Sequence, residues 1–243
     1  MKFLIVLFSI LASASAFGKR FALAVDTIPP VTPTQLACFK KSGIEGNFVR
    51  VYNPNANNGQ GAFDQSAPET IRNTYNAGIS AEAYAMLSFV SNKTAAQQID
   101  EIYNGLVSSG IPVAMRETWG KMIEDNVAFI QAAVDRAKQH GLTVGIYTER
   151  IEWMILTRNY AKIGDDVILW YWMYNGRGQK QESPANFDDF VAFGSWTASD
   201  VKQYGEGELI CGDNNVNRDV FITYDAHEPK LEVGSIALSM KKH

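Results

Sequence analysis

Short apolar runs alternate with amphipathic stretches along most of the chain. The stretches 94–109 and 124–140 repeat apolar residues at helical spacing, which predicts two helices. Shorter helices are predicted at 33–43 and 67–78, because a glycine follows the apolar pattern at the end of each. The apolar runs are rich in β-branched and aromatic residues, which favour strands. We predict strands at 21–27, 47–53, 80–89, 111–119, 142–149, 166–174 and 189–196.

Each predicted helix leads into a strand within a few residues. This order is typical of a parallel α/β sheet with helices outside it, either a barrel or an open doubly wound sheet. After residue 164 the helical pattern fades and the sequence becomes aromatic and rich in Gly and Asn. The fading indicates an incomplete barrel whose last strands are joined by loops.

The ends of the predicted strands carry carboxylates and aromatic side chains. In parallel barrels the carboxyl ends of the strands meet on one rim, where the catalytic residues of such folds lie. Aromatic faces stack on sugar rings while carboxylates bind hydroxyl groups, so this composition predicts a sugar-binding cleft. The residues of the predicted rim include Asp26, Tyr52, Glu82, Tyr84, Glu117, Tyr147, Trp170 and Trp172.

Asp26 is the first candidate catalytic residue. It shares a strand face with Ala22 and Ala24, because side chains alternate every two residues. Small residues inside a barrel would leave room for a carboxylate at the top. The alternative is that Asp26 only begins the turn at 28–30.

Glu117 is the second candidate catalytic residue. It lies in an apolar run and shares its strand face with Val113, Met115 and Trp119. Apolar surroundings raise the pKa of a carboxyl group, as a general acid near neutral pH requires. The alternative is a structural ion pair with Arg50.

The N-terminal residues have the features of a secretory signal peptide. Lys2 precedes an apolar run at 3–12 that is too short to span a bilayer, and the small residues Ala14 and Ala16 frame a cleavage site. We predict a signal peptide at 1–16 and one domain at 17–243, since no linker or repeat divides the chain. A membrane anchor is the alternative, but no second long apolar stretch follows.

Charge and cysteine usage narrow the function further. The net charge of −4 and the lack of a basic stripe argue against a nucleic-acid partner. Cys38 and Cys211 are the two cysteines, and an exported chain with an even pair is expected to form one disulfide; a catalytic thiol is the alternative.

The segment 213–221 resembles a calcium loop but lacks the required glycine and final acidic residue. No metal or cofactor is expected, and Asn92 begins a lone glycosylation sequon.

Several blocks of the chain, in the same order, resemble the nematode and amoeba lysozymes of glycoside hydrolase family 25. The resemblance implies a modified, TIM-like β/α barrel with fewer than eight outer helices, and hydrolysis of bacterial peptidoglycan. It matches Asp26 to the aspartate that ends strand one, and Glu117 to the general acid. The blocks are FALAVDT, FVRVY, YNAGISAEAY, AKQHGLTVGIYTERIEW, VILWYWMY, SPANFDDFVAFGSW, VKQYG and CGDNNVNRDVF.

Two positions depart from the pattern of this family. Met115 stands where the aspartate of an Asp-x-Glu pair belongs, and Asn217 stands where the family has an aspartate on its last strand. Asp213 and Asp219 are neighbours that could replace the latter, although a displacement of two residues moves a group roughly 7 Å along a strand. We therefore expect weak or altered activity.

We expect a secreted lysozyme-like protein that cleaves the β-1,4 bond between N-acetylmuramic acid and N-acetylglucosamine, in antibacterial defence or digestion. It would act outside the cell, in a gut lumen or in a secretory vesicle, as a monomer with peptidoglycan as its partner. A catalytically impaired peptidoglycan-binding protein is the alternative, and a sugar hydrolase of altered specificity is the third possibility. The residues expected to bind substrate are Tyr52, Glu82, Tyr84, Tyr147, Trp170, Trp172 and Asn217.

Overall fold

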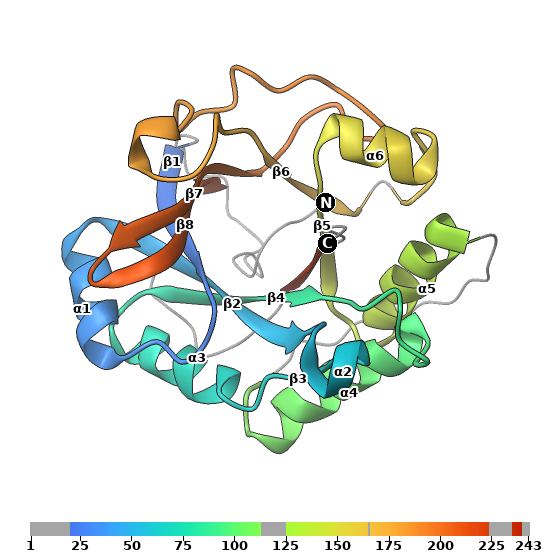
Figure 1. Ribbon diagram of the computed structural model, residues 1–243, viewed down its shortest axis with the longest axis horizontal. Helices are drawn as coiled ribbons and strands as arrows, with labels where there is room; N and C mark the ends of the chain where they lie inside the picture. The colour runs from blue at the N-terminus through green and yellow to red at the C-terminus, as the bar shows by residue number, and fades with distance from the viewer. Residues whose placement is uncertain (1–19, 113–124, 165, 224–234, 240–243) are drawn as a thin grey trace, which may run out of the picture.

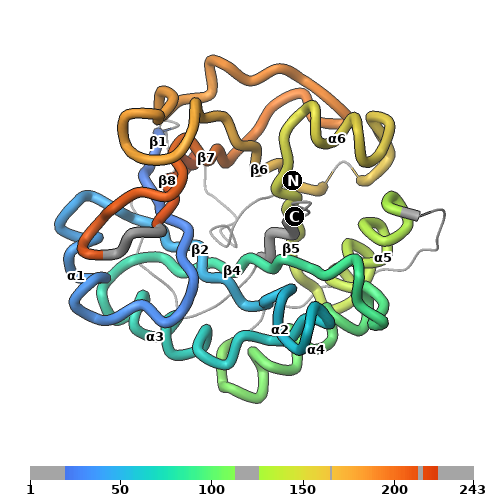
Figure 2. Tube along the Cα trace, viewed as in Figure 1, coloured from blue at the N-terminus to red at the C-terminus, as the bar shows by residue number. Residues whose placement is uncertain are grey.

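The computed structural model describes residues 20–112, 125–164, 166–223 and 235–239 (Figure 2). The predicted signal peptide and most of the predicted strand that contains Glu117 lie outside these ranges. Among the described residues, no helix has the length and apolar character needed to cross a membrane.

The described strands form one curled sheet in a mixed α/β fold (Figure 1). Their order is β1-β8-β7-β6-β5-β9-β4-β2-β3, and β1 also pairs with β2, so the curled sheet meets itself at β1. β1 runs parallel to β2 and antiparallel to β8. The strands are β1 (Arg20–Thr27), β2 (Ile44–Asn53), β3 (Ala62–Phe63), β4 (Ser80–Met86), β5 (Thr143–Tyr147), β6 (Ile168–Trp172), β7 (Val201–Ile210), β8 (Asp213–Thr223) and β9 (Ser235–Ser239).

The longer helices lie outside this sheet, along its lower and right-hand sides in Figure 1. Thr32 and Thr94 start two of them with capping boxes, in which the threonine side chain accepts a hydrogen bond from the backbone of the third helical residue. The helices are α1 (Pro33–Lys41), α2 (Ala56–Gly59), α3 (Ala67–Asn76), α4 (Ala95–Ser108), α5 (Asp125–Gln139), α6 (Arg150–Thr157) and the 3₁₀ helix η1 (Gln179–Gln181).

Residues of the strands contribute to three apolar cores, one toward the outer helices, one inside the curled sheet and one against α1. On β4, Ala81, Ala83 and Ala85 pack toward the helices, whereas Tyr84 packs inside the curled sheet. Ala22 and Ala24, which were predicted to lie inside the barrel, are part of the interior core. The interior core consists of Ala22, Ala24, Phe48, Tyr84, Tyr147, Ile168, Trp170, Val201 and Phe221.

Most predicted elements are confirmed, and some predictions are wrong. The predicted helices correspond to α1, α3, α4 and α5. The predicted strand at 189–196 is wrong, because this segment forms only an isolated bridge between Phe193 and Trp196. The segment 213–221, considered as a calcium loop, belongs to the long strand β8.

The place between β4 and β5 is held by β9, which runs parallel to both. The β-α-β order predicts the strand 111–119 at this position. Ile111 is not part of a strand, and 113–119 lie outside the described residues. The sheet thus takes a strand from near the end of the chain where the sequence pattern predicts an earlier one.

Cys38 of α1 and Cys211 of the β7–β8 turn form the expected disulfide. The two residues are 173 positions apart in the sequence. In the chain-entropy model, closing so long a loop stabilises the fold by about 4–5 kcal/mol. The disulfide ties the first helix to the hairpin that pairs with β1.

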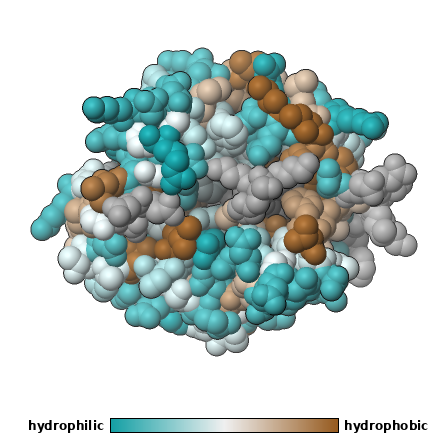
Figure 3. Space-filling model, in the orientation of Figure 1, coloured by the Kyte–Doolittle hydropathy of each residue, from teal (hydrophilic) through white to brown (hydrophobic). Residues whose placement is uncertain are grey.

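One helix of the outer layer is apolar on both sides. Trp153 of α6 is fully buried against Trp196, and its indole N–H donates to the backbone oxygen of Tyr160. Ile151 and Ile155 of the same helix are 58% and 72% exposed. Apolar side chains accordingly colour the upper right of the face in Figure 3, the region of α6 in Figure 1. A single buried indole therefore anchors this short helix.

A buried lysine fastens the long loop between β6 and β7 to the outside of the sheet. The ammonium group of Lys202 lies 2.6 Å from the carboxylate of Asp189 and donates to the backbone oxygen of Pro184 at 2.9 Å. The hydroxyl of Tyr171 donates to the other oxygen of Asp189 at 2.6 Å. This ion pair holds the loop where a regular barrel would have a helix.

We expect Lys202→Met to lower the free energy of unfolding by roughly 3 kcal/mol, because it removes one partner of a buried ion pair. Lys138→Met is the matched control, since Lys138 pairs with the mostly exposed Asp166. The control should cost no more than about 1 kcal/mol. Urea unfolding of both variants measures the difference, and equal losses would contradict the anchoring role of Lys202.

Candidate functional site

Asp26 lies near the carboxyl end of β1, inside the curled sheet, and is 6% exposed. Its partner in the antiparallel register is Asn217 of β8. The side-chain amide of Asn217 donates to both carboxylate oxygens of Asp26, at 3.0 Å each. Hydrogen bonds of this kind stabilise the charged form of a carboxyl group. The two hydrogen bonds therefore hold the carboxyl group of Asp26 in one orientation.

The backbone of β7 fixes the orientation of the Asn217 amide. The N–H of Gly207 donates to the side-chain oxygen of Asn217 at 2.9 Å, which leaves the NH₂ group facing Asp26. Gly207 has a φ of 62° and lies where the pairing of β7 and β8 shifts register. A Cβ atom at this position would lie 2.5 Å from the guanidinium group of Arg177, which is mostly exposed and can move aside. The local backbone thus requires glycine to orient the amide.

Asp219 carries a second carboxyl group two residue pairs deeper in the same hairpin, opposite Ala24. It is fully buried, and the indole N–H of Trp170 donates to one of its oxygens at 3.0 Å. Burial and the nearby charge of Asp26 raise the pKa of Asp219 well above its ordinary value. Its other oxygen has no hydrogen-bond partner among the described residues. The site therefore disfavours the charged form of Asp219.

Trp170 of β6 lies at the centre of the aromatic interior. Its ring is 4.5 Å from that of Phe48, and it meets Tyr147 and Tyr84 edge-on at 5.1 and 6.2 Å. The hydroxyl of Tyr147 donates to the side chain of Gln203 on β7. Burial first, and nearby carboxylates in addition, raise the pKa of both tyrosines, which keeps them neutral hydrogen-bonding groups.

Two further predicted residues border this interior. Glu82 of β4 is buried and lies opposite Phe48, which in turn lies opposite Asp26 across β2. Trp172, at the end of β6, is partly exposed and packs at the edge of the interior core. Its indole N–H donates to Glu152 at 3.4 Å. The structure thus brings together Asp26, Asn217, Glu82, Tyr84, Tyr147, Trp170 and Trp172.

Tyr52 is not part of this group, contrary to the sequence-based expectation. Its side chain packs in the helix-side core, and its hydroxyl donates to Glu101 of α4 at 3.1 Å. The pairing of β2 with β4 shifts register between Arg50 and Tyr52, so the strict alternation of faces fails there. Val51 and Tyr52 consequently both face the helices.

Glu117 and Met115 lie outside the described residues, so their predicted roles stay predictions. Arg50, considered as a structural partner of Glu117, forms an ion pair with Asp64 at 2.9 Å. Within the described ranges, no three side chains of His, Cys, Asp or Glu come close enough together to hold a metal ion.

Sequence analysis did not identify two residues of β7 that form hydrogen bonds with tyrosines at the site. Gln203 bonds Tyr147, and Glu206 bonds the hydroxyl of Tyr174 next to Trp172. Both belong to a strand that was not predicted, because its polar residues hid the apolar pattern. The resemblance placed Asn217 on the last strand, and the blocks VKQYG and CGDNNVNRDVF fall on β7 and β8.

The raised pKa of Asp219 predicts a pH-dependent stability. The protonated form contributes stability that is fully present below the unfolded-state pKa and is lost as the pH rises through the folded-state pKa. Asp219→Asn mimics the neutral acid. Between the unfolded-state and folded-state pKa values of Asp219, the free energy of unfolding of the variant should therefore rise relative to that of the wild type by about 1.4 kcal/mol per pH unit. Chemical unfolding between about pH 4 and pH 9 measures the gain.

The control for this experiment is Asp188→Asn, which changes an exposed carboxylate in the loop before β7. It should leave the pH dependence of stability as in the wild type. A constant difference between Asp219→Asn and the wild type at every pH would show that Asp219 is charged in the folded protein.

Comparisons with known proteins agree with this architecture. A family model described as "Lysozyme-like protein 1" matches residues 18–204. "Lysozyme-like protein 7" of Caenorhabditis elegans is 43% identical over 223 residues, which cover 89% of this chain and 77% of the relative. "Lysozyme-like protein 1" of the same organism is 42% identical over 83% of this chain and 69% of the relative.

The fold resembles solved lysozyme structures. A family GH25 lysozyme from Aspergillus fumigatus superposes with a TM-score of 0.57 at 15% identity, covering 83% of this chain and 94% of that one. This likeness concerns the fold alone, whereas the sequence matches extend over most of the chain. The chain therefore belongs to the lysozyme-like protein family.

Proposed function

We propose that this chain is a secreted lysozyme that hydrolyses the β-1,4 bond between N-acetylmuramic acid and N-acetylglucosamine in bacterial peptidoglycan. The observation that carries the proposal is the carboxylate of Asp26, held by the Asn217 amide beside an aromatic interior. The family membership of the chain supports peptidoglycan as its substrate class. The modified, TIM-like β/α barrel implied by the resemblance would suit the same assignment.

Asp26 would supply the negative charge that glycoside hydrolysis requires. The bond breaks through a transition state with positive charge on the sugar ring, and a carboxylate beneath that ring stabilises it. Asn217 fixes the carboxylate in place and adds no second negative charge. Asp219 adds none either while it is neutral, so the charge at the site is concentrated on Asp26.

Glu117 would act as the general acid that protonates the leaving oxygen. This role comes from the match of its position to the acid of family 25 lysozymes. Met115 in the preceding position removes a like charge that would help keep Glu117 protonated, so apolar surroundings must do this alone. The N-acetyl group of the substrate could assist the attack on the sugar carbon. The missing aspartate predicts a rate lower by about a hundredfold or more.

The aromatic residues would bind the sugar rings. Trp172 is suited to stacking, because it is partly exposed at the carboxyl end of β6 and lies 5.2 Å from the ring of Tyr174. Tyr84, Tyr147 and Trp170 are buried more deeply and would shape the floor of the site. Glu82 and Asn217 add polar groups to this floor.

Export supports a role against bacteria outside the cell. The predicted signal peptide directs the chain into the secretory pathway, and the Cys38–Cys211 disulfide suits an oxidising compartment. The mature chain at 17–243 would act as one monomeric domain, in antibacterial defence or digestion.

Purified mature protein is expected to clear suspensions of bacterial cell walls, and Glu117→Gln is expected to abolish the clearing. The amide keeps the shape of the side chain but carries no transferable proton. Glu69→Gln is the matched control, because Glu69 is exposed on α3, which lies outside the curled sheet (Figure 1). Turbidity loss over time measures all three proteins.

Met115→Asp separates a weak enzyme from a protein that only binds. If the missing aspartate limits catalysis, this variant should clear walls faster than the wild type. Clearing by Glu117→Gln at the wild-type rate would refute the role of Glu117. Binding of all variants to peptidoglycan without any clearing would instead identify a catalytically impaired wall-binding protein.

A further inference from the structure

The loop between β4 and α4 carries the sequence Asn92-Lys93-Thr94, a possible acceptor for an N-linked glycan. Asn92 and Thr94 are both exposed, and the loop follows the carboxyl end of β4. It therefore lies at the same end of the sheet strands as Asp26. Nothing in the proposed hydrolysis uses this loop.

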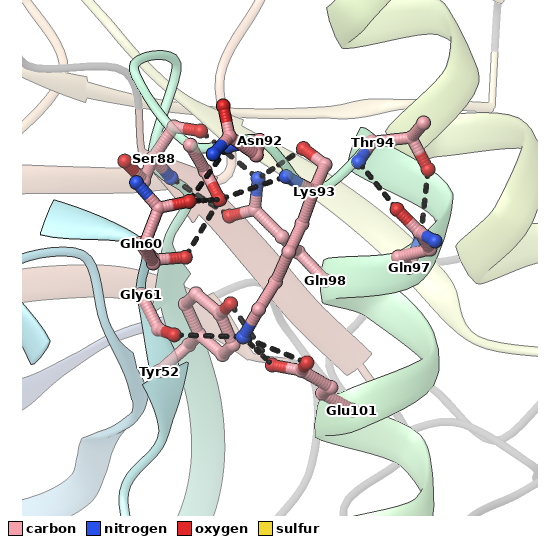
Figure 4. Close-up of polar contacts among 11 residues, drawn as sticks. Tyr52, Gln60, Gly61, Ser88, Asn92, Lys93, Thr94, Gln97, Gln98 and Glu101 are labelled. Carbon is pink, nitrogen blue, oxygen red and sulfur yellow. Dashed lines mark hydrogen bonds and ion pairs between the residues drawn. The ribbon is translucent and has the colours of Figure 1, made fainter. Parts of the chain in front are cut away.

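A network of hydrogen bonds holds the loop in place, as Figure 4 shows. The backbone N–H of Asn92 donates to the side chain of Gln60 at 2.7 Å, and the hydroxyl of Ser91 donates to the backbone oxygen of Gln60. The ammonium group of Lys93 donates to the backbone oxygen of Gly61 and pairs with Glu101 at 2.7 Å. The backbone of the loop is thus fixed on both sides of the acceptor residue.

The side chain of Asn92 takes no part in this network. Its hydrogen bond to the described residues comes from the backbone alone, and it lies at the outer edge of the group in Figure 4. A large group on its amide nitrogen would therefore break no contact of the described fold. Thr94 keeps its own role, because its hydroxyl accepts from the backbone of Gln97 and caps α4.

Two apolar side chains of the same loop are exposed in the part of the chain that the structure describes. Val90 is 81% exposed and Phe89 is 41% exposed, although the ring of Phe89 lies 4.3 Å from that of Phe129 in a tilted arrangement. Exposed apolar groups next to each other favour association with other molecules. A hydrophilic chain attached two residues further on would stand over them.

We propose that Asn92 carries an N-linked glycan that shields this apolar loop at the rim of the site. The proposal rests on the proposed export, because the modification takes place in the secretory pathway. A lipid-linked oligosaccharide diphosphate is the donor. The bond between the first sugar carbon and the phosphate oxygen breaks, a bond from that carbon to the amide nitrogen forms, the amide loses a proton to a base, and the lipid diphosphate leaves.

The full chain, produced in eukaryotic secretory cells, tests the proposal. The secreted protein should carry one glycan, which peptide-N-glycosidase removes while converting the attachment residue to aspartate. Peptide mass spectrometry should find that conversion at position 92. The enzymatically deglycosylated protein should associate more readily than the glycosylated protein in light scattering.

Two substitutions of Thr94 separate modification from folding. Thr94→Ser keeps both the acceptor sequence and the helix cap, so it should remain glycosylated. Thr94→Asp removes the acceptor sequence but keeps a good capping residue, so it should fold and lack the glycan. Equal thermal unfolding of Thr94→Asp and deglycosylated wild type shows that the cap is intact.

A secreted, disulfide-bonded chain with an unmodified Asn92 overturns the glycan and leaves the proposed function standing. A chain that stays in the cell with its first 16 residues uncleaved overturns the proposed export, and the glycan with it. A glycan that remains in Thr94→Asp would place the modification elsewhere.

Discussion

The pairing of β1 with two strands from opposite ends of the chain is the constraint on which the site depends. β1 pairs in parallel with β2, which follows it closely, and antiparallel with β8, which comes almost two hundred residues later. The second pairing places Asn217 opposite Asp26 and Asp219 opposite Ala24. The small side chains of Ala22 and Ala24 leave room inside the sheet for the carboxyl groups above them.

Asn217 and Asp219 have different roles at the site. The amide faces the one carboxylate that the proposed reaction needs, and its orientation is set by the backbone of Gly207. The acid lies deeper, bonded to Trp170, where burial disfavours its charge. A charged residue at both positions would place two negative charges next to Asp26 in an apolar interior. The arrangement instead places the hydrogen-bonding groups of Asn217 and Trp170 next to the two carboxyl groups.

The spacing of apolar residues along the chain predicted the elements whose neighbours in space are also neighbours in sequence. The helices α4 and α5 followed from their apolar stripes, and Asp26 followed from the alternation along β1. The β7–β8 hairpin was not predicted, because its partners are distant strands and its inward face carries polar groups such as Gln203. Tyr52 was misplaced because a register shift after Arg50 breaks the two-residue alternation, and no local signal in the sequence marks such a shift.

The most direct test of the account is the identity of the sugar ends released from purified peptidoglycan. Reduction of the digest followed by mass spectrometry distinguishes the two possible reducing sugars. We expect new reducing ends of N-acetylmuramic acid with the wild-type protein, and their loss with Asp26→Asn while the variant stays folded. New ends of N-acetylglucosamine, or equal release by Asp26→Asn, would contradict it.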